Sequence, residues 1–168
     1  MNSAIPSFRM QFALGALACI GLMAYALYAQ YHLHLDPCPL CIFQRVAVIA
    51  IGLVFLVGAL HAPNSSGARR TYAVFAVLAA LGGIAVAGRQ LWLQSLPADQ
   101  VPACGPGLGY IWDSMPNKLE VLKKVFTGSG ECAVVNWRFL GLAMPAWVLI
   151  CFVVLGAWAV FAGFRKQR

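Results

Sequence analysis

Charged side chains are scarce in this sequence of 168 residues, and acidic ones are the scarcest. Only 10% of the residues are charged, and only 5 are Asp or Glu, whereas 61% are hydrophobic. A soluble domain averages about 25% charged and about 45–50% apolar residues. A water-soluble fold of this length cannot bury so much apolar surface. The shortage of charge therefore excludes an ordinary soluble domain and indicates a membrane protein surrounded by a lipid bilayer.

The excess of basic residues, which gives a net charge of +7, does not indicate nucleic-acid binding. The Lys and Arg residues stand at the ends of apolar runs, and no basic stripe alternates with aromatic residues that could stack on bases. We therefore expect no nucleic-acid partner. Internal repeats and low-complexity tracts are also lacking, and the length is typical of a single domain, 1–168.

Four apolar runs are long enough to cross a bilayer, at about 10–29, 41–60, 71–92 and 142–163. A spanning helix needs about 20 mostly apolar residues. The sequence thus predicts an all-α bundle of four transmembrane helices, with loops at about 30–40 and 93–141. The first run could instead be a signal peptide, because Ala24-Tyr25-Ala26 resembles a cleavage site. Its apolar stretch is long for a signal peptide, so we favour the span.

The basic residues near the helix ends predict the orientation, because Lys and Arg are enriched in cytoplasmic loops. One side carries Arg9, Arg69, Arg70, Arg165, Lys166 and Arg168. The other carries every acidic residue, together with Lys118, Lys123, Lys124 and Arg138. We therefore expect both termini and the 61–70 loop in the cytoplasm, and the 30–40 and 93–141 loops outside.

The second outer loop contains a short amphipathic segment at about 118–126. Leu119, Leu122, Val125 and Phe126 fall at helical spacing, and lysines occupy the other face. This pattern predicts a short helix that lies in the membrane interface. The alternative is a helix packed on the loop's own residues, which we consider weaker because the loop is too short for a large core.

The six cysteines separate into two groups. Cys19 and Cys151 fall within predicted spans, where cysteine commonly serves as a small packing residue. The other four fall in the outer loops, where disulfides can persist; they are Cys38, Cys41, Cys104 and Cys132. Two pairs of outward cysteines in so short a chain form a specific pattern.

The Cys38-Pro39-Leu40-Cys41 spacing favours redox chemistry, because one thiol can resolve a mixed disulfide formed at the other. A Cys₄ zinc site is the competing interpretation, but the second pair lacks tight ligand spacing, so we predict no metal site. Pro39 suits a first helical turn, which places Cys41 near a helix N-terminus that favours a thiolate. Arg45 follows one turn deeper, either beside that thiolate or extended to the interface.

Two segments resemble signatures of the disulfide bond formation protein B (DsbB) family. The first is PCPLCIFQR at 37–45, and the second combines GECA at 130–133 with WRFLGLAMPAW at 137–147. The resemblance covers essentially the whole chain, with four spans and both cysteine pairs in the same order. It implies a protein of the bacterial inner membrane whose cysteines face the periplasm. Such proteins reoxidise DsbA, a periplasmic thioredoxin-fold dithiol oxidase, and pass the electrons to ubiquinone or menaquinone of the membrane quinone pool.

The resemblance also implies a role for each outer cysteine, with redox disulfides Cys38–Cys41 and Cys104–Cys132. The DsbA thiolate would attack Cys104 and form the mixed disulfide. The released Cys132 would attack Cys38, and Cys41 would become a thiolate facing the quinone.

The resemblance suggests further residues for the quinone site. Arg45 would hold the Cys41 thiolate and a quinone oxygen, and Met144 would line the pocket. Family members often carry a His on the third span near the quinone, whereas this sequence has Gln90 there. Arg89 is either a second cation at the site or an interface anchor, so Arg89 and Gln90 are further candidates.

Two other interpretations compete. Vitamin K epoxide reductases also combine a four-helix bundle with a Cys-x-x-Cys, but in that family the motif lies late in the chain, whereas here it opens the second span. A membrane scaffold with two structural disulfides would tolerate both mild reductant and the loss of Arg45.

Overall fold

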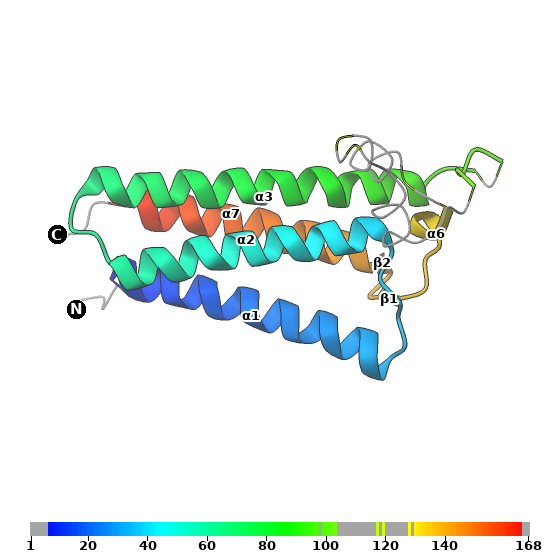
Figure 1. Ribbon diagram of the computed structural model, residues 1–168, viewed down its shortest axis with the longest axis horizontal. Helices are drawn as coiled ribbons and strands as arrows, with labels where there is room; N and C mark the ends of the chain where they lie inside the picture. The colour runs from blue at the N-terminus through cyan, green and yellow to red at the C-terminus, as the bar shows by residue number, and fades with distance from the viewer. Residues whose placement is uncertain are drawn as a thin grey trace.

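Four long helices dominate the computed structural model, which describes residues 7–97, 99–103, 117, 119, 128 and 130–165. They run antiparallel along one bundle (Figure 1) and are α1 (Phe8–His32), α2 (Pro39–His61), α3 (Ser66–Gln94) and α7 (Met144–Phe164). All four are long and apolar enough to cross a membrane. The prediction of a mostly helical protein with four candidate spans is confirmed. Cys104 and the interfacial segment 118–126, apart from Leu119, lie outside the described residues.

Side-chain caps mark where three of the helices begin, and these starts lie before the predicted apolar runs. The Ser7 hydroxyl accepts from the Met10 amide at 3.4 Å, and the Ser65 hydroxyl accepts from the Ala68 amide at 3.3 Å. The Cys38 sulfur caps α2 in the same way. Such caps satisfy the amide donors that a first turn leaves unpaired.

A short β-hairpin and a one-turn helix interrupt the all-α prediction. β1 (Arg138–Phe139) pairs antiparallel with β2 (Leu142–Ala143), and α6 spans Gly130–Ala133. Leu140 and Gly141 join the strands with φ of 50° and 81°, the left-handed values that a two-residue hairpin turn requires. α7 begins at Met144, two residues after the approximate start of the fourth apolar run at 142, because Leu142 and Ala143 belong to the hairpin.

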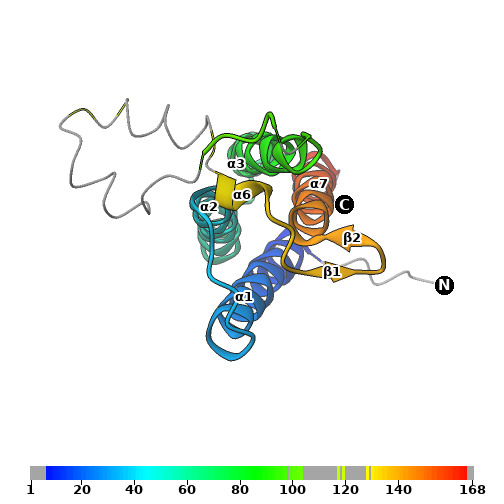
Figure 2. The same ribbon diagram turned by 90° about the vertical axis from the view of Figure 1, so that its right-hand side faces the viewer.

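The helices form a ring in the order α1, α2, α3, α7 when the bundle is viewed along its axis (Figure 2). In the most apolar window of each helix, only 28% of the residues of α1, α2 and α7, and 33% of those of α3, are buried inside the protein. The remaining apolar side chains face outward. Lipid can cover such a surface, because the backbone groups in the middle of each helix are paired within that helix.

The interior combines large aromatic rings with small residues on the facing helix. Phe12, Phe55 and Phe152 are completely buried, and the Phe12 and Phe55 rings meet edge to face at 5.0 Å. Gly58 faces Phe12 and Gly83 faces Phe152 so closely that an added Cβ would lie 2.5 Å from a ring carbon. These glycines let the membrane helices approach each other.

The bundle has two different ends. We call the end where α1 and α3 finish and α2 and α7 begin the cysteine end, because it holds Cys38, Cys41 and Cys132. Figure 1 shows α1 diverging from the other helices toward this end, and Figure 2 shows α6 over α2 and α3 with the hairpin beside α7. The other end, where the helices lie closer together, is called the opposite end.

Candidate redox site

Cys38 and Cys41 lie together at the first turn of α2. Their sulfurs are 3.0 Å apart, and the Cys38 sulfur also accepts from the Cys41 backbone amide at 3.4 Å. Both are free thiols. Because a disulfide is about 2.05 Å long, the two sulfurs need to approach by only about 1 Å to form one. The local structure of Cys-x-x-Cys thus holds a dithiol in a geometry close to that of its disulfide.

Cys132 lies beside Cys38, although 94 positions separate them in the sequence. It is completely buried on α6 and packs in one apolar cluster with Cys38, Leu40, Val86 and Leu93. A hydrogen bond between the Cys132 and Cys38 thiols raises the pKa of Cys38 above its ordinary value, and the Cys41 thiol and burial raise it further. Cys38 is therefore a protonated thiol at neutral pH, and it contacts the sulfurs of both Cys132 and Cys41.

A backbone hydrogen bond joins the residue before Cys104 to the start of α6. Ala103 directly precedes Cys104, and its carbonyl accepts from the Gly130 amide at 3.4 Å. Gly130 begins α6, two residues before Cys132. The structure therefore ties the residue before Cys104 to the helix that carries Cys132, while Cys104 itself is outside the described residues.

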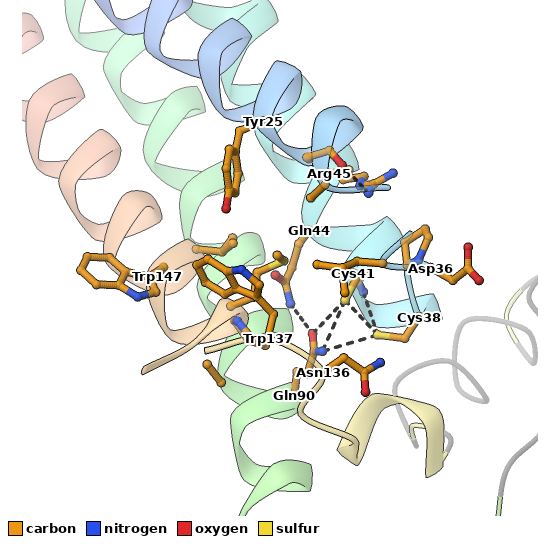
Figure 3. A pocket seen from close by; sticks show the side chains of 18 of the residues that line it. Tyr25, Asp36, Cys38, Cys41, Gln44, Arg45, Gln90, Asn136, Trp137 and Trp147 are labelled. Atoms are coloured by element: carbon orange, nitrogen blue, oxygen red, sulfur yellow. Dashed lines mark hydrogen bonds between the residues drawn. The ribbon is translucent and has the colours of Figure 1, made fainter. Parts of the chain in front are cut away.

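A pair of buried glutamines faces the two thiols (Figure 3). Gln44 on α2 donates from Nε2 to Gln90 Oε1 on α3 at 2.7 Å, and Gln90 Nε2 lies 3.4 Å from both the Cys38 and the Cys41 sulfur. The two side chains are only 4% and 3% exposed. The Gln90 carboxamide is thus the polar group in direct contact with the dithiol.

A mainly apolar cavity of about 210 Å³ lies next to Cys41, between α1, α2, α3, α7 and the hairpin. Trp137 and Trp147 form part of its wall; Trp147 donates from its indole to the Phe139 carbonyl at 3.1 Å, and the Trp137 ring lies 6.4 Å from that of Tyr25. The predicted residues on the lining are Cys38, Cys41, Arg45, Gln90 and Met144.

Arg45 lines this cavity, but its guanidinium binds α1 rather than a sulfur. It donates to the Gln30 side-chain oxygen and, at 3.1 Å, to the Ala26 carbonyl. Among the described contacts, none joins Arg45 to Cys41, and Figure 3 shows the guanidinium apart from both sulfurs. Arg45 therefore connects the diverging end of α1 to α2 beside the cavity.

The remaining candidates fall in different places. Met144, the first residue of α7, is on the cavity wall, whereas Arg89 is not on it and instead covers the Trp92 ring at 4.1 Å. Cys151 borders the cavity, and Cys19 is buried between helices. Arg89 thus has the contact expected of an interface anchor.

Two residues of the site, Gln44 and Trp137, have no role in the sequence-based prediction. Gln44 had a usable signal, because an amide in the middle of an apolar span is costly unless it finds a partner. Its position three residues after Cys41 places it on the same helix face. Trp137 gave no such signal, since its approach to Tyr25 depends on how the hairpin folds back.

Comparison with known proteins agrees with this arrangement. Residues 8–162 match the family described as "Disulfide bond formation protein DsbB". Proteins named "Disulfide bond formation protein B" from Xanthomonas oryzae pv. oryzae and Methylococcus capsulatus are both 49% identical to this chain, over 100% and 98% of it and over 97% and 99% of their own lengths. The protein of that name from Hahella chejuensis is 53% identical over 90% of this chain and 91% of its own length.

These matches exceed what a shared bundle architecture alone would produce, because they extend over both cysteine segments. The chain therefore belongs to the DsbB family of membrane disulfide bond formation proteins and has the disulfide oxidoreductase role that this family name describes.

Proposed function

We propose that this protein reoxidises a DsbA-like thioredoxin-fold dithiol protein of the periplasm and passes the electrons to ubiquinone or menaquinone in the bacterial inner membrane. The observation that carries the proposal is the position of Cys38. Its sulfur contacts those of both Cys132 and Cys41, and Cys41 borders the apolar cavity. This order of sulfurs is what a relay from an aqueous partner to a membrane acceptor needs.

The proposed orientation places both termini in the cytoplasm and the cysteine end in the periplasm. At the opposite end, Arg70 and Arg165 cover the rings of Phe164 and Phe161. The described acidic residues, Asp36, Asp99 and Glu131, all belong to the segments around the cysteine end. This asymmetry supports the orientation, because basic residues favour the cytoplasmic face.

The proposed exchange begins when the partner's thiolate attacks Cys104 of a Cys104–Cys132 disulfide and releases Cys132. The Cys132 sulfur then attacks Cys38 of the Cys38–Cys41 disulfide, so that one S–S bond forms, one breaks, and Cys41 leaves as the thiolate. Cys132 contacts Cys38, which supports attack at that sulfur. The full cycle removes two electrons and two protons from the partner dithiol, and the quinone accepts these electrons and protons and becomes a quinol.

The cavity residues fit a quinone ring. Such a ring needs apolar walls for its faces and hydrogen-bond donors for its two carbonyl oxygens. Met144 and Trp147 supply apolar wall, and Arg45 and the Gln90 amide are donors on the same lining. When bound, the quinone supplies a two-electron acceptor, which must be more oxidising than DsbA at about −120 mV. Cys41 presents its sulfur on this lining, and we place no quinone contact on Arg89.

The test combines the purified protein with a reduced DsbA-like protein and ubiquinone, and follows quinone reduction by its ultraviolet absorbance. We expect reduction by the unmodified protein, none by Cys41→Ala, and a normal rate for the matched variant Cys19→Ala, because Cys19 is buried away from the cavity. Quinone reduction that persists in Cys41→Ala, or that is absent in the unmodified protein, would contradict the proposal.

A further inference from the structure

The buried glutamine pair holds the amide of Gln90 in one orientation. Gln44 presents its Nε2, which can only donate, at 2.7 Å from Gln90 Oε1. The oxygen end of the Gln90 carboxamide is thereby directed toward Gln44. The nitrogen end lies 3.4 Å from the Cys38 sulfur and 3.4 Å from the Cys41 sulfur. The oxygen also accepts from the Cys41 thiol at the longer distance of 3.6 Å, a contact that is lost when this thiol ionises.

The orientation of this amide matters chemically because its two ends have opposite effects on a sulfur anion. An N–H donor stabilises a thiolate, whereas a carbonyl oxygen at the same place repels it. Hydrogen bonds to ionised groups are also stronger than neutral ones. A freely rotating amide could turn either its NH₂ group or its oxygen toward the sulfur. It therefore stabilises a thiolate reliably only if another group fixes its orientation.

Among the described contacts, few groups donate a hydrogen bond to the Cys38 or Cys41 sulfur. The donors recorded to the two sulfurs, apart from the thiols themselves, are the Cys41 backbone amide and Gln90 Nε2. The described hydrogen bonds of the Arg45 guanidinium go to Gln30 and to the Ala26 carbonyl, and none of them reaches a sulfur. The side-chain donor to the dithiol is therefore a neutral amide carried by α3.

We propose that Gln44 is a positioning residue that acts through Gln90. It fixes the Gln90 carboxamide with its NH₂ group toward the Cys38 and Cys41 sulfurs and so stabilises the thiolate that forms when the Cys38–Cys41 disulfide opens. The inference rests on the proposed function for the moment at which that thiolate forms, but the geometry it describes belongs to the reduced protein by itself.

A double-mutant cycle on the reduced protein tests the inference without a partner protein or a quinone. The rate of Cys41 alkylation by iodoacetamide at pH 7 is measured by peptide mass spectrometry for Gln90→Met, Gln44→Met and the double variant. Methionine keeps the side-chain length and removes the donors. We expect each single variant to react about tenfold more slowly, because one charge-assisted hydrogen bond is lost. The double variant should react at the rate of Gln90→Met, because Gln44 acts only through Gln90.

The matched control is Gln11→Met, which removes another buried amide, 1% exposed, from the first turns of α1 at the opposite end. Its Cys41 rate should equal that of the unmodified protein, and thermal unfolding identifies any variant that fails to fold. Normal alkylation in Gln44→Met, or independent and additive losses in the double variant, would overturn the inference. Because no quinone is present, a failure of quinone reduction leaves these outcomes unaffected.

Discussion

The two ends of the bundle differ in the side chains that fill their interior. The opposite end is a packed aromatic core, in which Phe12 meets Phe55 and approaches Gly58 closely. The opposite end buries the single amide side chain of Gln11, whereas the cysteine end buries the hydrogen-bonded pair of Gln44 and Gln90 and has an apolar cavity of about 210 Å³. Tight packing at one end stabilises the fold, whereas the other end gives up packing for polar groups and space beside its sulfurs.

The path of α1 shows the same difference. At the opposite end α1 packs on α2 through aromatic rings, and Trp158 of α7 donates to the Gln11 carbonyl of α1 at 2.9 Å. At the cysteine end α1 diverges, and Arg45 reaches it through hydrogen bonds to Gln30 and the Ala26 carbonyl (Figure 1). The comparison indicates that stability and redox chemistry depend on different residues. A single substitution should therefore be able to impair either one without the other.

The largest effect should come from Cys38→Ser. Serine keeps an oxygen that can cap α2 but cannot form a disulfide, so the proposed relay loses the sulfur that connects its two cysteine pairs. Quinone reduction with a reduced DsbA-like protein should fall to the background rate, while the thermal unfolding temperature stays close to that of the unmodified protein. A measurable catalytic rate would mean that electrons bypass Cys38.

Gly58→Ala should have the opposite effect: it should lower the stability of the fold and leave quinone reduction intact. Its Cβ would lie 2.5 Å from a Phe12 ring carbon, and such overpacking costs about 1–3 kcal/mol of the free energy of unfolding. Chemical or thermal denaturation measures the loss, and quinone reduction per folded molecule should be unchanged. The control is Gly67→Ala at the same end, where a Cβ has nothing within 4 Å; equal losses in both variants would show that the close approach is unimportant.

Arg45→Leu should weaken quinone use about tenfold in KM, the equivalent of about 1.4 kcal/mol. The variant removes a donor from the cavity lining and also the contacts that hold α1 beside it. A quinone titration of the steady-state rate measures the change. Arg70→Leu, which removes a guanidinium from the ring of Phe164 at the opposite end, should leave KM unchanged, and an equal effect in the two variants would argue for a general loss of charge.

The smallest effect concerns the pH dependence of Cys38. Its pKa is raised first of all by the Cys132 thiol, so below that pKa the thiolate fraction is smaller than for an ordinary cysteine. Cys132→Ala removes this cause and should speed the alkylation of Cys38 severalfold between pH 7 and 9, as followed by peptide mass spectrometry. Cys19→Ala should not change that rate. A slower reaction in Cys132→Ala would show that Cys132 assists ionisation instead.

The sequence predicts the architecture well because lipid imposes a simple requirement. Each span needs about 20 apolar residues, and each of the four predicted runs corresponds to one helix. The hairpin was missed because Leu142 and Ala143 continue an apolar run into α7, and hydropathy does not distinguish a strand from a helix there. A Leu at φ 50° in the turn gives no sequence signal either.

The candidate site was predictable where spacing along one helix decides it. Cys38, Cys41 and Arg45 follow from the first turns of α2, although the partner of the Arg45 guanidinium does not. That Gln90 faces the sulfurs, and that Cys132 packs on Cys38, depends on how α3 and α6 pack against α2. Such contacts arise between distant segments, and periodicity carries no information about them.

The most direct test of the central claim, that Cys38 connects the two cysteine pairs, is a trapped disulfide. In a Cys41→Ala, Cys104→Ala double variant, the sulfurs of Cys38 and Cys132 remain as neighbours. After mild oxidation in membranes, peptide mapping under non-reducing conditions should recover a Cys38–Cys132 linked peptide as the main product. Recovery of both cysteines as free thiols, or of Cys38 linked to Cys19 or Cys151, would contradict the account.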